Sequence, residues 1–483
     1  MQKRLIACVA ALLCLALLGG CGKTPDAPPS SAAGVTGTDA AQGAEIASAS
    51  ANAATETSET ETATLEANSS SSLSTSQKSN PTIAVTTTRK AQVPVMLNTQ
   101  KFATPAEGAN DFAFRLSKAL LQGNGKKNFV SSPYSVWLPL AALVNATKAE
   151  QKPALLAALG AAGFSEKELN DAAEEMLERL THEQDIIAYG DEYYHNPLRI
   201  ANAIFVDERV TLKKSFADTF AKSYKGSAQQ VDFLSPSAVK TVNDWASKQT
   251  EGLINNIIEE FDPATVAAIA NAIYFSDRWD WEFNPDQTKK DIFHGLNGDT
   301  QADFMLREGD YLPYYEDDKL QAMPLRFKTG GALYILLPKD GDANKLLSGM
   351  MTSYYDKINR EASDAKGKLL LPRFEIDSGV MKLAGALEAL GVPLFDPVTA
   401  PLTGGLIEED LKVFVGDAVQ KAVIKVDEKG TTAAAVTVLA MAGAGIPEPP
   451  TKVFSMVCDK PFVFVLHGGY GGAVLFTGVV NQA

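Results

Sequence analysis

The chain has 483 residues, with 44 lysines and arginines against 58 aspartates and glutamates, and a formal net charge of −14. It carries no basic stripe, and an acidic chain repels polyanions, which argues against binding to nucleic acid or to heparin-like polymers. About 45% of the residues are hydrophobic, which is enough for a large core.

Residues 1–21 have the pattern of an export signal. A short positive region precedes the apolar stretch Leu5–Leu18, which has the length of a signal-peptide core rather than of a membrane span. The sequence LGGC that ends the segment resembles the lipobox of bacterial lipoproteins, in which the cysteine is lipidated and becomes the new N-terminus. We therefore predict that lipidated Cys21 anchors the protein in the cell envelope. Gly22 offers no acidic retention signal, which points to the outer membrane if the cell is Gram-negative. A plain secretory signal with an incidental cysteine is the alternative.

The cysteines support an exported chain without an internal disulfide. Cys8 and Cys14 leave with the signal, and lipidation would occupy Cys21. Cys458 then has no partner within the chain. It lies in the apolar run VFSMVC, so we expect a small, buried hydrophobic side chain.

The segment 22–101 is dominated by small and polar residues, and the first aromatic residue of the whole chain is Phe102. Such a segment buries too little apolar area to offset its conformational entropy. We expect a disordered tether that holds the domain 102–483 away from the membrane. A binding role for its serines and threonines is the alternative.

The remaining chain predicts one α+β domain. Apolar residues recur at helical spacing over three early segments, and strand-like alternation follows. Strands also dominate from Lys412 onward. The expected helices are 110–122, 136–144 and 153–161, and the expected strands are 200–206, 269–275 and 332–337. Helices followed by strands in this mixture fit an α+β fold.

Enzyme and metal motifs are absent from the sequence. The histidines match no common zinc spacing, and there is no HExxH, no GxSxG and no GxxxxGK[ST]. The glycine cluster 468–472 lies between two strand-like runs and predicts a hairpin turn. We therefore predict no catalytic residue, no metal site and no cofactor.

The stretch 426–450 is unusual in composition. A charged turn ending at Gly430 leads into small or β-branched residues, 431–437, and then into Ala, Met, Gly and Pro. A helix is possible at the alanines, but the neighbouring Thr, Val, Gly and Pro favour an extended segment or a mobile loop. As a strand it would present a narrow, nearly uncharged face that slides easily into a sheet. An ordinary connection between two strands is the alternative.

An ordered series of motifs resembles the serpins, a family of serine protease inhibitors. The resemblance covers about residues 105–483. It rests on NFVSSPYS (128–135), LRIANAIFV (198–206), VNDWASKQTEGLI (242–254), NAIYFSDRWDWEF (271–283), LPRFEI (371–376), AVQKAVIKVDEKGTTAAA (418–435) and DKPFVFVL (459–466). It implies the serpin fold, in which helices pack around a large central, mostly antiparallel sheet, with an exposed mobile reactive loop over about residues 428–452.

The resemblance also implies a mechanism. In serpins a serine protease cleaves the loop and forms an acyl-enzyme, and the freed loop inserts into the central sheet and traps the enzyme. A hinge of small residues at the start of the loop permits this insertion. The hinge residues implied here are Glu428, Gly430, Thr431, Ala433, Ala434 and Ala435.

Family spacing puts the reactive bond at Ala444–Gly445, with Met441 or Ala442 as alternative bait residues. Small residues around the bond suit elastase-like or subtilisin-like serine proteases. Cysteine proteases form another class of target, and a monomer is expected. A non-inhibitory serpin acting as a surface binding module is the main alternative, and an unrelated hydrolase or adhesin lipoprotein is a more remote one.

The resemblance implies a polar cluster, the family's shutter, under the sheet. The matching residues are Ser132, Ser135, Asn271 and Gln420. Many serpins have histidine where this chain has Gln420. Because glutamine both donates and accepts hydrogen bonds, we expect sheet opening to be retuned rather than lost.

Overall fold

The computed structural model describes residues 9–20, 100–181, 186–187, 193–194, 198–328, 330–430, 450–469 and 472–483; for 9–20, 186–187 and 193–194 it describes the backbone. The tether 22–101 and the loop residues 431–449 lie outside the described residues, apart from residues 100 and 101. The described part of the glycine cluster, residues 468, 469 and 472, lies between β17 (Phe462–His467) and β18 (Val474–Val480), which pair antiparallel as expected for a hairpin.

The described helices fall mainly in the first half of the domain. They are α1 (Pro105–Leu121), α2 (Pro133–Val144), α3 (Lys152–Ala158), α4 (Glu166–Thr181), α5 (Lys214–Tyr224), α6 (Pro236–Gln249), α7 (Ala343–Ser348), α8 (Thr352–Glu361) and α9 (Ala384–Ala389), with the 3-10 turn η1 (Pro285–Gln287). The first three begin one to five residues earlier than the sequence predicts and end near the expected positions. In α1 and α2 the earlier start follows from a proline in the first turn, where a missing N–H costs nothing.

The strands form two large sheets and a short hairpin. The long sheet has the order β13 (Phe374–Asp377), β15 (Lys412–Val426), β1 (Val9–Gly20), β7 (Thr265–Phe275), β5 (Leu198–Asp207) and β6 (Gly226–Val231), and β14 (Met381–Lys382) pairs with β15. The curved sheet has the order β16 (Val453–Val457), β12 (Ser363–Pro372), β9 (Gly298–Glu316), β10 (Leu320–Arg326), β11 (Ala332–Pro338), β17 (Phe462–His467), β18 (Val474–Val480) and β2 (Phe129–Ser131), and β8 (Lys289–Gly295) pairs with β9. Strands β3 (Ile186–Ile187) and β4 (Tyr193–Tyr194) pair with each other.

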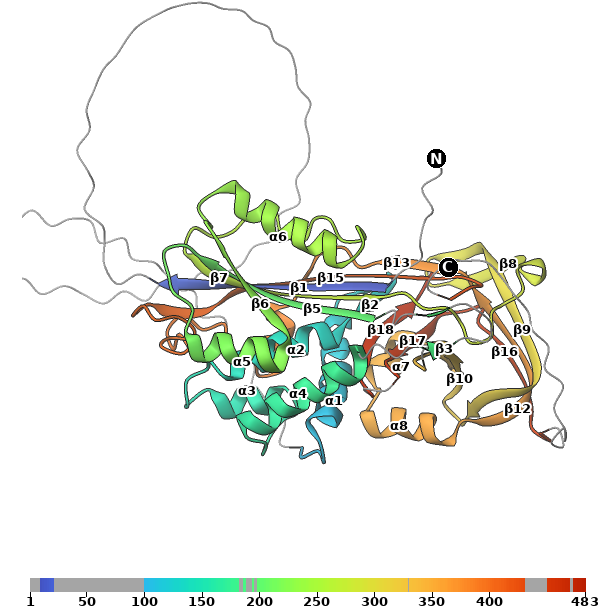
Figure 1. Ribbon diagram of the computed structural model, residues 1–483. Helices are drawn as coiled ribbons and strands as arrows, with labels where there is room; N and C mark the ends of the chain where they lie inside the picture. The colour runs from blue at the N-terminus through green and yellow to red at the C-terminus, as the bar shows by residue number, and fades with distance from the viewer. Residues whose placement is uncertain are drawn as a thin grey trace, which may run out of the picture. The chain divides into compact units, whose positions relative to one another are not determined.

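Helices cover both faces of the long sheet. Figure 1 shows α6 on one side of this sheet and α2 to α5 on the other. The alternation of β7 explains both packings, because the alanines at positions 268, 270 and 272 join α6 in one apolar cluster, while Ile269 and Ile273 join α2 in the main core. Helix α2 is buried on every side, as expected for a central helix that is apolar all round. The expected α+β architecture with a large, mostly antiparallel sheet is confirmed.

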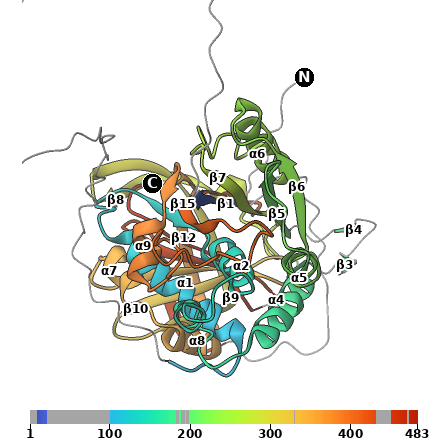
Figure 2. The ribbon, with the colours of Figure 1, turned by 90° about the vertical axis from the view of Figure 1, so that its left-hand side faces the viewer.

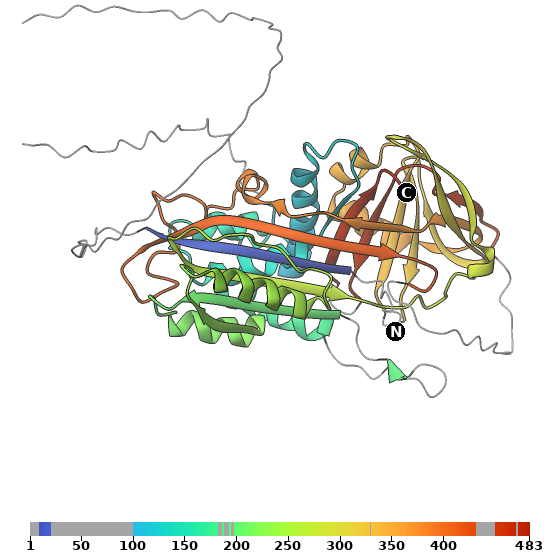
Figure 3. The same cartoon turned by 90° about the horizontal axis from the view of Figure 1, so that it is seen from above.

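Strand β1 comes from the segment that the sequence identifies as a signal-peptide core. It lies between β15 and β7 in the middle of the long sheet, where Figure 3 shows it beside β15. The end-on view in Figure 2 places it among β15, β7 and β5. Sequence patterning gave no indication of this pairing. A short, uncharged apolar run is compatible both with an export signal and with a central strand, so the pattern does not distinguish them. The predicted export signal and lipidation at Cys21 stay predictions.

Candidate functional site: the hinge turn and the strand slot

The slot is the space between β15 and β7 that β1 occupies. Strand β1 is antiparallel to both neighbours, with Ala10 opposite Val423 and Gly20 opposite Lys412 on the β15 side. On the β7 side its register runs from Val9 opposite Phe275 to Leu18 opposite Thr265. The long sheet therefore accepts a complete strand in its centre, bonded through the backbone on both flanks.

A tight turn follows β15 at the entrance of the slot. The amide of Asp427 donates to the carbonyl of Gly430 at 3.2 Å, and the amide of Gly430 donates back at 3.3 Å. Gly430 has φ 130°, a backbone conformation that favours glycine. A Cβ atom there would lie 2.3 Å from the carbonyl oxygen of Asp277 and 2.8 Å from Cα of Arg278. The closeness of this neighbouring backbone excludes any larger residue.

The backbone of the turn is fastened to the segment that follows β7. The amide of Trp279 donates to the carbonyl of Lys429 at 3.0 Å, and its indole Nε1 donates to the carbonyl of Asp427 at 2.9 Å. The amide of Phe283 donates to the carbonyl of Glu428 at 2.9 Å. These bonds tie the end of β15 to the chain that leaves β7, so the turn bridges the two strands that border the slot.

The side chain of Glu428 forms a second fastening, which we call the hinge latch (Glu428, Arg373 and Thr288). Nε of Arg373 donates to both carboxylate oxygens at 2.9 Å, and its Nη2 donates to Oε1 at 2.6 Å. The hydroxyl of Thr288 also donates to Oε1, at 2.5 Å. Glu428 is 5% exposed. Burial in itself raises the pKa of the Glu428 carboxyl, but hydrogen bonds from Arg373 and Thr288 outweigh it and hold this pKa below its ordinary value. The latch therefore stabilises an ionised carboxylate.

Part of the implied shutter comes together under the sheet. Gln420 is fully buried; its Oε1 accepts from the hydroxyl of Ser131 at 2.8 Å and from the amide of Ser132 at 3.2 Å. Its Nε2 donates to the carbonyl of Ser132 at 2.7 Å and to the hydroxyl of Ser135 at 2.9 Å. Gln420 thus joins β15 to the start of α2, and both the oxygen and the nitrogen of its side-chain amide are hydrogen-bonded.

Asn271 stands apart from this cluster. Asn271 and Gln420 are both opposite Leu13 of β1, one on each side, so β1 separates them. The amide nitrogen of Asn271 donates to Asn202 at 2.8 Å, whereas its Oδ1 is buried without a hydrogen-bond partner among the described side chains. Asn271 therefore lies level with Gln420 across an occupied slot, whereas Ser132 and Ser135 contact Gln420 directly.

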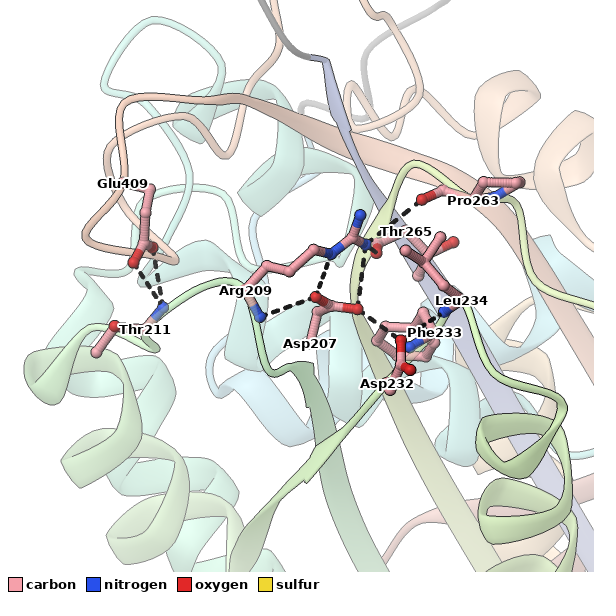
Figure 4. Close-up of polar contacts among 9 residues, drawn as sticks. All are labelled: Asp207, Arg209, Thr211, Asp232, Phe233, Leu234, Pro263, Thr265 and Glu409. Carbon is pink, nitrogen blue, oxygen red and sulfur yellow. Dashed lines mark hydrogen bonds and ion pairs between the residues drawn. The ribbon is translucent and has the colours of Figure 1, made fainter. Parts of the chain in front are cut away.

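Polar contacts that we call the base clasp (207–213 and 263–265 with 406–409) lie at the end of the long sheet where β5 stops and β7 begins. Figure 4 shows the guanidinium of Arg209 on the carboxylate of Asp207 and turned toward Pro263 and Thr265. Because Asp207 ends β5 and Thr265 begins β7, this group ties two strand ends together.

The same clasp reaches across the base to the chain before β15. The carboxylate of Glu409 accepts from the amide of Thr211 at 2.9 Å, and the amide of Glu408 donates to the carbonyl of Thr211 at 2.9 Å. The amide of Lys213 donates to the carbonyl of Leu406 at 2.9 Å. The two halves of the long sheet are therefore joined at their base without using the slot.

Several implied residues lie outside the described part of the chain: Thr431, Ala433, Ala434, Ala435, Ala444, Gly445 and the lipidation residue Cys21. Sequence reasoning missed the hinge partners Trp279, Arg373 and Thr288, although the first two lie within quoted motifs. Cys458 is fully buried and free, as expected, and burial raises the pKa of its thiol. Among the described residues no cluster of His, Cys, Asp and Glu could hold a metal ion, and no helix is long and apolar enough to cross a membrane.

Comparisons with known proteins agree with this geometry. A family model described as serpin (serine protease inhibitor) matches residues 107–483. Serpin-ZX of Hordeum vulgare is 32% identical over 389 residues, covering 76% of this chain and 94% of the relative. The plasma serine protease inhibitor of Bos taurus is 28% identical over 386 residues, covering 78% and 91%. The crystal structure of the thermophilic serpin tengpin in its native state aligns with a TM-score of 0.67 at 24% identity, covering 78% of this chain and 94% of tengpin. That likeness shows the fold.

Proposed function

Because the chain belongs to the serpin (serine protease inhibitor) family, we propose that it traps serine proteases by inserting its cleaved reactive loop between β15 and β7. Serpins are protease inhibitors rather than enzymes, and a bovine relative bears the name of plasma serine protease inhibitor.

The observation that carries the proposal is the position of the hinge turn relative to the slot. Strand β15 ends at Val426, and the turn that closes at Gly430 reverses the chain at the entrance of the slot. A loop that continued from Gly430 along the sheet would run antiparallel to β15, which is the direction that β1 takes. The direction and position of the slot therefore support the proposal that the loop inserts between β15 and β7.

Insertion also needs the fastenings around Gly430 to hold before cleavage and to yield afterwards. A native state of this kind is a kinetic trap above a more stable inserted form. The hinge latch and the bonds from Trp279 bind the turn on one side of the loop. Strand β16 binds the other side, because it pairs with β12 directly after Pro450. We propose that cleavage between these two anchors releases the loop.

The bait sequence supports a preference for small residues. Family spacing puts the reactive bond at Ala444–Gly445, and no lysine or arginine occurs from 431 to 450. Elastase-like and subtilisin-like proteases have primary pockets that fit alanine or methionine. We therefore propose these as the target class, with cysteine proteases as a second class.

The test is to incubate the chain lacking residues 1–21 with pancreatic elastase and with subtilisin, followed by denaturing electrophoresis and intact mass. A covalent adduct, minus the peptide that begins at the cleaved bond, is expected, and the N-terminus of that peptide fixes the bait residue. Thr431→Arg is the matched control, because a charge at the first inserting position opposes burial. It should be cleaved without an adduct. Cleavage of both chains without an adduct would show a non-inhibitory serpin.

We also propose that the protein is held in the cell envelope through lipidated Cys21. The LGGC sequence and the apolar stretch before it support this, and multiple acyl chains would bury enough methylenes for firm anchoring. Expression with labelled palmitate, with Cys21→Ser as the control, tests it. Label in the wild type alone is expected, and label in neither chain would contradict the proposal.

A further inference from the structure

The occupant of the slot is itself informative, because β1 belongs to the predicted export signal. The strand runs from Val9 to Gly20 and therefore ends directly before Cys21, the residue at which the lipobox resemblance places leader cleavage. Cleavage between Gly20 and Cys21 would therefore remove the whole of β1 from the chain.

Strand β1 and the inserted reactive loop would occupy the same slot between β15 and β7. Strand β1 runs antiparallel to β15 from a position opposite Val423 to one opposite Lys412, and the loop would start from the turn beyond Val426 and descend past the same residues. Neighbouring strands lie about 4.8 Å apart, so one strand fills the space between β15 and β7 and a second has no room. Occupancy by one excludes the other.

The leader also has the chemistry of a central strand. Its sequence, VAALLCLALLGG, contains no charge and no proline, so each residue offers the sheet an amide donor and a carbonyl acceptor. The strands on both sides of it are largely apolar, and β7 is buried along its entire length. A charged or proline-containing segment would leave buried backbone groups or charges unpaired in this position.

We propose that the slot is a binding site for the chain's own leader, and that a chain retaining residues 9–20 in the slot is a non-inhibitory precursor. This proposal rests on the proposed function. Hydrolysis of the Gly20–Cys21 bond by a leader peptidase, with water as the co-reactant, leaves a carboxylate on Gly20 and an amine on Cys21. Residues 9–20 are then a separate peptide, so their binding to the slot becomes intermolecular. When this peptide dissociates, the slot is free for the reactive loop.

The experiment compares three forms of the full chain, purified in mild detergent: wild type, a β1 variant and a matched control. The variant Leu12→Pro/Leu15→Pro removes backbone donors facing each neighbour, since successive residues of a strand bond to opposite sides. The matched control, Ser48→Pro/Ser50→Pro, places the same substitutions outside β1. Hydrogen exchange of β7 and β15 reports occupancy of the slot, and adduct formation with elastase reports trapping.

We expect the β1 variant to lose amide protection in β7 and β15 and to form the covalent adduct, while wild type and control keep the protection and are cleaved without an adduct. Unchanged protection in the β1 variant would overturn the proposal, because the leader would then not hold the slot. Equal adduct yields from all three chains, despite a change in protection, would overturn it as well. A change in protection with no adduct from any chain would uphold leader binding and count against the proposed inhibitory function instead.

Discussion

Replacing Arg373 with alanine would leave the Glu428 carboxylate with the Thr288 hydroxyl as its remaining side-chain donor. The side chain of Glu428 is 6% exposed, whereas that of Arg373 is 45% exposed, so solvent weakens the pair from one side. Hydrogen bonds to charged groups contribute about 1.5–3 kcal/mol, and loss of a fully buried pair costs about 3–5 kcal/mol. For this half-exposed arginine we expect a loss of about 2 kcal/mol in the free energy of unfolding.

The pH dependence separates the ion pair from simple packing. Because the pKa of Glu428 lies below its ordinary value of 4.5 in the folded protein, its contribution to stability is fully present above that value. The contribution is lost as the pH falls through the lower, folded-state pKa. The difference in free energy of unfolding between wild type and Arg373→Ala should therefore be about 2 kcal/mol at pH 7 and should shrink toward pH 3.

Urea unfolding suits this measurement better than heating. In a domain of this size about 2 kcal/mol moves the melting temperature by roughly 2–3 °C. A double-mutant cycle with Glu428→Gln isolates the pair, since in that background Arg373→Ala should cost little. An equal loss at pH 7 and pH 3, or an equal loss in the Glu428→Gln background, would refute the assignment of the hinge latch as an ion pair.

Three further predictions concern other parts of the molecule. Gly430→Ala should lower the free energy of unfolding by about 3 kcal/mol, measured by urea unfolding, because alanine disfavours a positive φ and its Cβ would clash with the carbonyl of Asp277. A loss below about 0.5 kcal/mol would contradict the close contact between Gly430 and Asp277. Gln420→Ala should cost about 2–3 kcal/mol by leaving buried serine groups unpaired, measured in the same way with the exposed Gln229→Ala as the control. In the chain lacking residues 1–21, the thiol of Cys458 should resist alkylation until the protein unfolds, because burial raises its pKa; rapid native labelling at neutral pH would show an accessible thiol.

The sequence was a good guide wherever local pattern decides structure. Helix α2 and strand β7 are strongly apolar runs of the lengths typical of a buried helix and a buried strand, so their existence was predictable. The starts of helices shifted where proline occupied the first turn. Gln420 was identified as a shutter residue by motif, and the structure places it on Ser132 and Ser135.

Long-range pairing was not accessible in the same way. The latch joins Glu428 to Arg373 and Thr288, and no periodicity links positions so far apart along the chain. The placement of β1 was missed because its apolar residues fit two environments, and register across a sheet depends on partners that a single stretch of sequence does not name.

The direction of the slot has a consequence for the order of events in the long sheet. Because the hinge turn and Val9 of β1 lie at the same end of this sheet, a loop that followed the course of β1 would enter beside the hinge turn. It would then advance toward the base clasp one residue pair after another, so insertion would be directional. The 12 residues of β1 measure its travel within the sheet, about 40 Å at roughly 3.3 Å per residue. A group attached to the leading end of the inserting loop would be carried about 40 Å, from the hinge end of the long sheet toward the end with the base clasp.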